Sequence, residues 1–153
     1  MVPYSVFCQQ FTNVELEQYV RKGIESYNSL NVDSITAGGL TGFENGFGYR
    51  SRSPRPALSP DATRSVLHKF LDGMDYYKIT INEIQTRIDG DVGLAWGFFT
   101  EKFQRKGARP ELVQVRFTVT VKKDQSGWRT LLAHRDAQQF DTKGNYIPLP
   151  PDE

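Results

Sequence analysis

Residues 75–140, in the second half of the chain, alternate apolar and polar side chains in four consecutive runs. A period of two residues is typical of β-strands whose two faces have different surroundings. Short segments rich in Gly, Asp and Pro separate the runs, at residues 88–91, 106–110 and 124–127. Tight hairpin turns favour these residue types. The pattern predicts one antiparallel meander, and the rest of the chain must pack against it.

Two helices in tandem are predicted near the start of the chain. Thr12 and Glu15 have the spacing of a capping box. The apolar stripe that follows has helical spacing and consists of Leu16, Tyr19, Val20, Gly23, Ile24, Tyr27 and Leu30. Asn31 can cap a second, shorter helix, which the pair Gly38 and Gly39 would end.

A third helix is predicted from Ser59, a cap residue that precedes Pro60 at the first helical position. Gly73 is placed to end it. Its apolar stripe is Val66, Leu67, Phe70, Leu71 and Met74. His68 lies between the stripe positions, and no carboxylate stands at helical spacing from it, so we expect a surface residue rather than a ligand.

Residues 38–60 are rich in Gly, Pro, Ser and Arg and predict loops around a short strand at residues 47–51. The glycines here match neither nucleotide-binding fingerprint. Arg50, Arg52 and Arg55 beside Tyr49 are one way to follow a nucleic-acid backbone. The whole chain has 19 basic and 18 acidic residues, and this near-neutral balance argues against nucleic acid and anionic membranes as partners.

The length of 153 residues suits one domain. We expect an arm at residues 1–11, a domain at 12–140 and a tail at 141–153. The only cysteine, Cys8, has no partner for an internal disulfide. No leader and no apolar run of membrane-spanning length is evident, which predicts a soluble, cytoplasmic protein.

The predicted strands are not uniform. The apolar phase shifts near Asn82 and Glu83, which predicts a bulge and therefore a curved sheet.

In the third run, one face is apolar and the other carries Arg116 and Thr118. We interpret the second face as the lining of a cavity and the first as an interface with another copy; a plain solvent face is the alternative.

The order of these elements resembles the nuclear transport factor 2-like superfamily, in particular its SnoaL-like members. The matching motifs are Gly90-Asp91-Val92, Arg116-Phe117-Thr118, Gly127-Trp128-Arg129 and His134-Arg135. The resemblance implies an α+β fold, in which a curved antiparallel sheet wraps around N-terminal helices to form a cone-shaped pocket. It implies no single function, because the superfamily includes isomerases, cyclases, dehydratases, epoxide hydrolases and non-catalytic assembly modules.

By position, the resemblance implies that Arg116 and His134 line the cone. Asp136 departs from the pattern, since a small hydroxyl residue is common there. The catalytic Asp of ketosteroid-isomerase-like members has no counterpart in residues 47–53. Thr118 stands where a paired arrangement of epoxide-hydrolase-like members would need a carboxylate.

His134 and Asp136 are two residues apart on one strand and therefore point to the same face. We expect them to act with Arg116 as the catalytic residues, with His134 relaying a proton, Asp136 orienting it or acting as base, and Arg116 fixing an anionic oxygen. Expected ligand-binding residues are Trp96, Tyr49, Tyr27 and Thr118. The alternative is that Arg116 and Asp136 form a cross-strand ion pair.

Two classes of function follow. The first is a cofactor-independent isomerase, cyclase or dehydratase that uses acid–base chemistry on an apolar or carboxylated small molecule. The second is a non-catalytic, dimeric ligand-binding or assembly module. A third metal ligand at suitable spacing is missing beside His134 and Asp136, which argues against a metal site.

A homodimer is predicted because one apolar strand face would otherwise be exposed. The expected interface consists of Val113, Val115, Phe117 and Val119, with Phe99 on the neighbouring run. Trp128, beside the last turn, is expected to close one end of the core rather than to bind a ligand.

Overall fold

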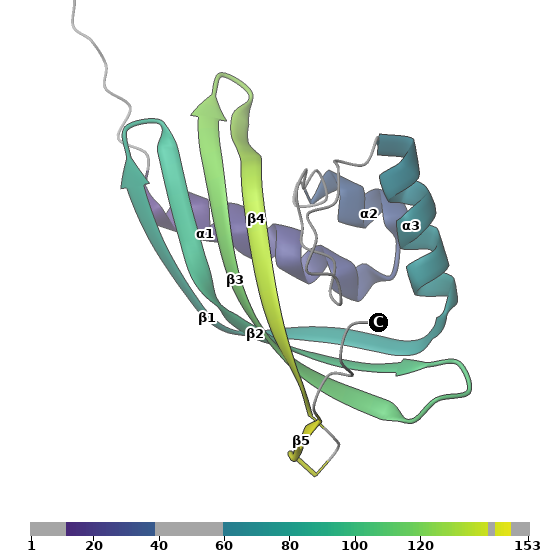
Figure 1. The fold of residues 1–153 in the computed structure, drawn as a ribbon. Helices are drawn as coiled ribbons and strands as arrows, with labels where there is room; N and C mark the ends of the chain where they lie inside the picture. The colour runs from purple at the N-terminus through teal and green to yellow at the C-terminus, as the bar shows by residue number, and fades with distance from the viewer. Residues whose placement is uncertain (1–11, 39–59, 141–142, 148–153) are drawn as a thin grey trace, which may run out of the picture.

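The computed structural model describes residues 12–38, 60–140 and 143–147. Its helices are α1 (Asn13–Glu25), a 3-10 turn η1 (Ser26–Ser29), α2 (Val32–Ala37) and α3 (Pro60–Asp72). The strands are β1 (Met74–Asp89), β2 (Val92–Arg105), β3 (Pro110–Asp124), β4 (Gly127–Phe140) and β5 (Tyr146–Ile147). The helices lie in the concavity of a curved, open sheet (Figure 1). The expected α+β fold with a curved antiparallel sheet is confirmed.

Side-chain caps start the first two helices as the sequence predicts. The Thr12 hydroxyl accepts a hydrogen bond from the Glu15 backbone N–H at 3.3 Å, and Asn31 Oδ1 accepts one from Ser34 N–H at 2.9 Å. Both bonds satisfy backbone donors that the first helical turn leaves without partners. The Asn28 amide bonds both the N–H and the carbonyl of Ile79, at 2.6 and 3.0 Å, and so attaches η1 to β1.

The sheet order is β1-β2-β3-β4-β5, and every neighbouring pair is antiparallel. The register of β1 against β2 shifts between Ile81 and Glu83, which confirms the predicted bulge. Gly97 faces this bulge, and a Cβ there would lie 2.0 Å from the Glu83 carbonyl oxygen. A glycine is therefore required at this position opposite the bulge.

One face of the sheet forms the main core with α1. Leu16, Val20 and Ile24 of α1 pack in the same buried cluster as Tyr77, Ile79, Ala95, Phe99, Phe103, Val113, Val115, Phe117, Val119 and Val121. Trp128 packs against this cluster, as expected. A smaller cluster of Val32, Ile35 and Leu67 joins α2 to α3.

The predicted dimer interface is wrong in its residues. Val113, Val115, Phe117, Val119 and Phe99 are all buried under the helices. The physical reason is that the apolar stripe of α1 needs an apolar surface, and the aliphatic face of β3 supplies it.

A few residues that the sequence analysis placed in the buried stripes of helices lie elsewhere in the structure. Leu30 is exposed and has φ 52, because the chain turns there between η1 and α2. Val66 is 53% exposed, and Met74 belongs to β1 rather than to α3. His68 is at the surface, as predicted. The predicted strand at residues 47–51 and the Ser59 cap lie outside the described residues.

None of the helices in the described ranges has the length and apolar character that crossing a membrane requires.

Candidate functional site

The sequence-predicted residues of the long strands gather on the outer face, opposite the helices. Trp96 of β2, Arg116 and Thr118 of β3, and His134 and Asp136 of β4 line one hollow of about 440 Å³. Strand pairing explains this grouping, because Thr118 of β3 is paired with Trp96 of β2 on one side and with His134 of β4 on the other. The structure brings these residues of the long strands together, but on the outer face of the sheet and not inside the cone, as the sequence analysis expected.

The expected position of Arg116, His134 and Asp136 inside the cone needs correction. The side chains of Arg116 and Asp136 are 79% and 52% exposed, and they form an ion pair at 2.7 Å. The cross-strand pair that the sequence left open as an alternative is thus present. A solvated pair of this kind contributes about 0–1 kcal/mol to stability, so it is a surface feature rather than a fold determinant.

A different polar cluster lies on the inner face. The Glu101 carboxylate of β2 is only 6% exposed, and Arg135 Nη2 of β4 donates to both of its oxygens at 3.0 Å. The Tyr77 hydroxyl of β1 donates to Glu101 Oε1 at 2.8 Å. Since β3 lies between β2 and β4, Arg135 reaches across it. Side chains from three strands therefore converge on one buried carboxylate.

Aromatic rings pack against the two side chains that bind this carboxylate. The Tyr77 ring meets Phe70 of α3 edge-on at 5.2 Å and Tyr27 of η1 at 6.5 Å between ring centroids. The Arg135 guanidinium lies 5.9 Å from the centroid of the Phe99 ring. Although 46% of the Arg135 side chain is exposed, its charged group is thus held between an aromatic ring and a carboxylate.

The electrostatics of the inner cluster follow from burial and charge. Burial, and then the Glu101 carboxylate, raise the pKa of Tyr77 far above its ordinary value. Burial also raises the pKa of Tyr27, against the opposing effect of Arg135. Burial disfavours the charge on Arg135, but Glu101, Tyr77 and Tyr27 together outweigh this effect, and the pKa of Arg135 is raised. The cluster holds an ion pair beside two neutral phenols.

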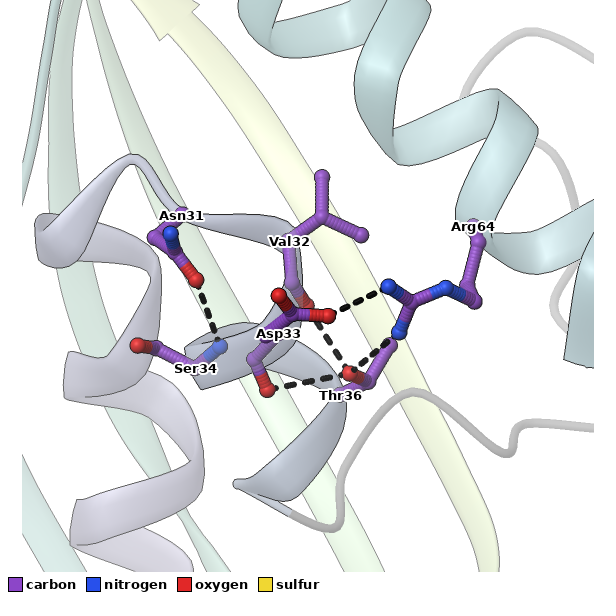
Figure 2. Close-up of polar contacts among 6 residues, drawn as sticks. All are labelled: Asn31, Val32, Asp33, Ser34, Thr36 and Arg64. Carbon is purple, nitrogen blue, oxygen red and sulfur yellow. Dashed lines mark hydrogen bonds and ion pairs between the residues drawn. The ribbon is translucent and has the colours of Figure 1, made fainter.

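The two helices above this cluster are joined by a polar contact. Figure 2 shows Arg64 of α3 reaching the Asp33 carboxylate and the Thr36 hydroxyl of α2. Thr36 in turn donates to the carbonyls of Val32 and Asp33, at 2.9 and 3.0 Å. The hydrogen bond from Arg64 lowers the pKa of the Asp33 carboxyl. The contact fixes α2 against α3, whose Phe70 touches Tyr77.

Of the expected ligand-binding residues, Tyr27 is on the inner face, Trp96 and Thr118 are on the outer face, and Tyr49 lies outside the described residues. The inner residues Tyr77, Glu101 and Arg135 were missed. Glu101 carried a signal in the sequence, because it interrupts an otherwise apolar phase between Phe99 and Phe103. An acidic residue in a buried phase needs a partner, and that need points to a cluster.

Within the described parts of the chain, no group of three or more His, Cys, Asp and Glu residues is arranged to hold a metal ion.

Comparison with known proteins identifies the fold. No family model matches the sequence, and no curated protein matches it. A ketosteroid isomerase-like protein from Erwinia carotovora atroseptica is 15% identical, with a TM-score of 0.62 over 83% of this chain and 98% of its own. An NTF2-like protein of unknown function from Pseudomonas putida is 13% identical, with a TM-score of 0.61 over 90% and 95%.

A third similar structure is the CaMKII hub of S. rosetta, which is 16% identical, with a TM-score of 0.59 over 81% of this chain and 95% of the hub. The chain therefore has the fold that NTF2-like and ketosteroid isomerase-like proteins share. At these identities the likeness concerns the fold alone.

Proposed function

We propose that this protein is a homodimeric small-molecule-binding module, in which the outer sheet face joins two copies and the inner face holds the ligand. The observation that carries the proposal is an apolar set on the outer face. Leu94, Trp96, Phe98 and Leu132 are each between 36% and 47% exposed. Leu94 and Leu132 flank Thr120 from either side in the strand register. Monomers rarely leave several large apolar side chains exposed together.

The charges of the outer face favour a second copy as the occupant. Arg116 and Asp136 face each other on β3 and β4, so the face carries both signs side by side. In a two-fold symmetric interface, every contact between one residue and a second residue of the other copy occurs twice, with the two copies exchanged. Arg116 of one copy can then pair with Asp136 of the other. The similarity in fold to a CaMKII hub supports the same proposal.

Binding fits the geometry better than acid–base catalysis. Asp136, the expected base, is ion-paired with Arg116 on an exposed face. On the inner face, Glu101 is bonded by both Arg135 and Tyr77. Donors of the protein itself therefore occupy the oxygens of this carboxylate, which suits a role in holding side chains in place rather than in proton transfer.

The dimer is tested by placing charge on the outer face. Phe98→Lys combined with Leu132→Lys should convert the dimer to a folded monomer, because two copies would bring four ammonium groups into an apolar contact. Sedimentation velocity gives the mass, and far-UV circular dichroism reports folding. Val66→Lys is the control, since Val66 is an exposed apolar residue as well but lies on α3. A monomeric parent, or a double variant that stays dimeric, would contradict the proposal.

Charge reversal sharpens the test. Arg116→Glu should weaken the dimer at least several-fold, because it places a second acid beside Asp136. Adding Asp136→Arg should restore association, since the acid is then at position 116 and the arginine at position 136, and the two can again pair across the interface. Failure of the second change to restore it would show that the charges do not meet across the interface.

A second candidate is catalysis in the outer hollow, which the grouping of Arg116, His134 and Asp136 favours. It predicts turnover of a ketone or carboxylate that Asp136→Asn abolishes while mass and fold are unchanged. A panel of such compounds, followed by NMR, separates this candidate from the binding module.

A further inference from the structure

We infer that the hollow on the outer face binds a bulky organic cation, and that this ligand competes with the second copy for the same surface. The competition rests on the proposed function, whereas the binding does not. The hollow has a volume of about 440 Å³ and so falls within the range of roughly 300–1,000 Å³ that is usual for small-molecule sites. It therefore has room for an organic molecule rather than for a bare ion alone.

Strand pairing sets four residues of the hollow in one row across the sheet. Phe98 of β2 is paired with Glu83 of β1 on one side and with Arg116 of β3 on the other. Arg116 is paired in turn with Asp136 of β4. From β1 to β4 the row therefore consists of an acid, an aromatic ring, a base and a second acid, and all four residues line the hollow.

The base of this row is engaged by the acid of β4, which leaves the acid of β1 uncompensated. Arg116 Nη2 donates to Asp136 Oδ2 at 2.7 Å, and β4 is on the side of β3 that is opposite to β1. Within the described residues, Glu83 accepts a hydrogen bond from the neutral Gln85 amide and forms no ion pair. With His134 neutral, one negative charge remains in the hollow. This charge favours a cation and disfavours a phosphate or a carboxylate.

Two exposed aromatic rings favour an organic cation over a metal ion. Trp96 and Phe98 are 36% and 44% exposed, and they share one face because they are two residues apart on β2. Aromatic rings attract a cation through their quadrupole, and quaternary ammonium groups are bound in this way, whereas a metal ion needs several oxygen or nitrogen ligands. The rings and the Glu83 carboxylate together suit a trimethylammonium group.

A ligand in the hollow covers part of the surface that the proposed dimer needs. Trp96 and Phe98 belong both to the hollow and to the apolar set of the interface. Leu94 and Leu132 belong to the same set but do not line the hollow. Replacing Leu94 and Leu132 therefore opens the outer face and leaves the residues of the hollow unchanged.

The test compares choline with its neutral isostere 3,3-dimethylbutan-1-ol by isothermal titration and by ¹H–¹⁵N NMR. It uses the full-length parent and the double variant Leu94→Gln with Leu132→Gln. The double variant should bind choline at least about tenfold more tightly than the alcohol, because only choline carries the charge. In sedimentation velocity, saturating choline should shift the parent towards the monomer, and the alcohol should not.

Further changes in the double variant identify the groups responsible. Glu83→Gln should remove most of the preference for choline, and Trp96→Leu should weaken choline binding several-fold. Arg116→Met should strengthen choline binding, because it removes a positive charge and leaves Asp136 without its partner. Such a gain cannot come from partial unfolding. Asp89→Asn is the matched control, because Asp89 is an exposed acid of the same strand as Glu83 but does not line the hollow.

Several results would overturn the inference. They are an absence of choline binding to the double variant at millimolar concentration, equal binding of the two probes, an unchanged preference after Glu83→Gln, or its loss in Asp89→Asn. A dimeric parent that binds choline without dissociating would contradict the competition. A parent that is monomeric without ligand would contradict the proposed dimer instead, and the titrations would still decide whether the hollow binds a cation.

Discussion

The two faces of the sheet each carry a pair of an arginine and an acid, and the pairs differ in what surrounds them. On the inner face, Arg135 reaches over β3 to Glu101, which is buried. On the outer face, Arg116 and Asp136 are direct neighbours across β3 and β4, and both are exposed. The same chemical pair is therefore part of the core on one side and part of the solvated surface on the other. Burial, rather than the distance between the charged atoms, decides how strongly the loss of one partner of each pair affects folding stability.

The largest expected difference between the faces is in the unfolding free energy lost when a phenylalanine is truncated on each of two neighbouring strands. Phe117 is 5% exposed and Phe98 is 44% exposed. Phe117→Ala should cost about 3–5 kcal/mol of unfolding free energy, because it leaves a cavity in the core. Phe98→Ala should cost roughly 0.5 kcal/mol or less within one copy. Urea unfolding at several protein concentrations measures both values and separates association from folding. Equal losses at low concentration would contradict the assignment of inside and outside.

A smaller effect is expected from breaking the ion pairs. Arg135→Met leaves the Glu101 carboxylate buried with its charge uncompensated, and a fully buried pair broken in this way costs about 3–5 kcal/mol. We expect about 2–4 kcal/mol, because water reaches the half-exposed Arg135 and screens the pair. Arg116→Met is the control on the outer face and should cost at most about 1 kcal/mol. Denaturant unfolding of the two variants compares them directly.

The double variant Glu101→Met with Arg135→Met provides the second control. Removing both charges should recover most of the stability that Arg135→Met loses, since no ion is then left in the core. A double variant as unstable as the single one would show that packing, rather than charge, is what Arg135 supplies.

The last expected effect is absent near neutral pH and appears only in alkaline solution. The pKa values of Tyr27 and Tyr77 are raised in the folded state, so the folded protein keeps protons that the unfolded chain releases. Their contribution to stability is complete below about pH 10 and falls as the pH rises above it, by up to about 1.4 kcal/mol per pH unit for each group. Tyr27→Phe with Tyr77→Phe should flatten this decline in unfolding measurements. An equally steep decline in the variant would place the responsible groups elsewhere.

Sequence patterns determined the local features of this protein, because caps, turns and bulges depend on residues close together in the chain. Thr12 and Asn31 cap their helices as predicted, and the phase shift near Asn82 and Glu83 gave the bulge. The hairpin turns also lie where the local residue types predict them. Alternation further showed that Arg116, His134 and Asp136 share a face.

Tertiary structure alone decided which face is inside. A period of two divides a strand into two sets of side chains, but it does not say which set the helices will cover. In β2 the sequence does not indicate which set faces the helices, because both sets are apolar: Trp96 and Phe98 belong to one, and Ala95 and Phe99 to the other. The contact between Glu101 and Arg135 depends on the register of two strand pairs and on a side chain that crosses β3. Such a long-range contact leaves no local spacing in the sequence, since its partners meet only when β2 and β4 have both paired with β3.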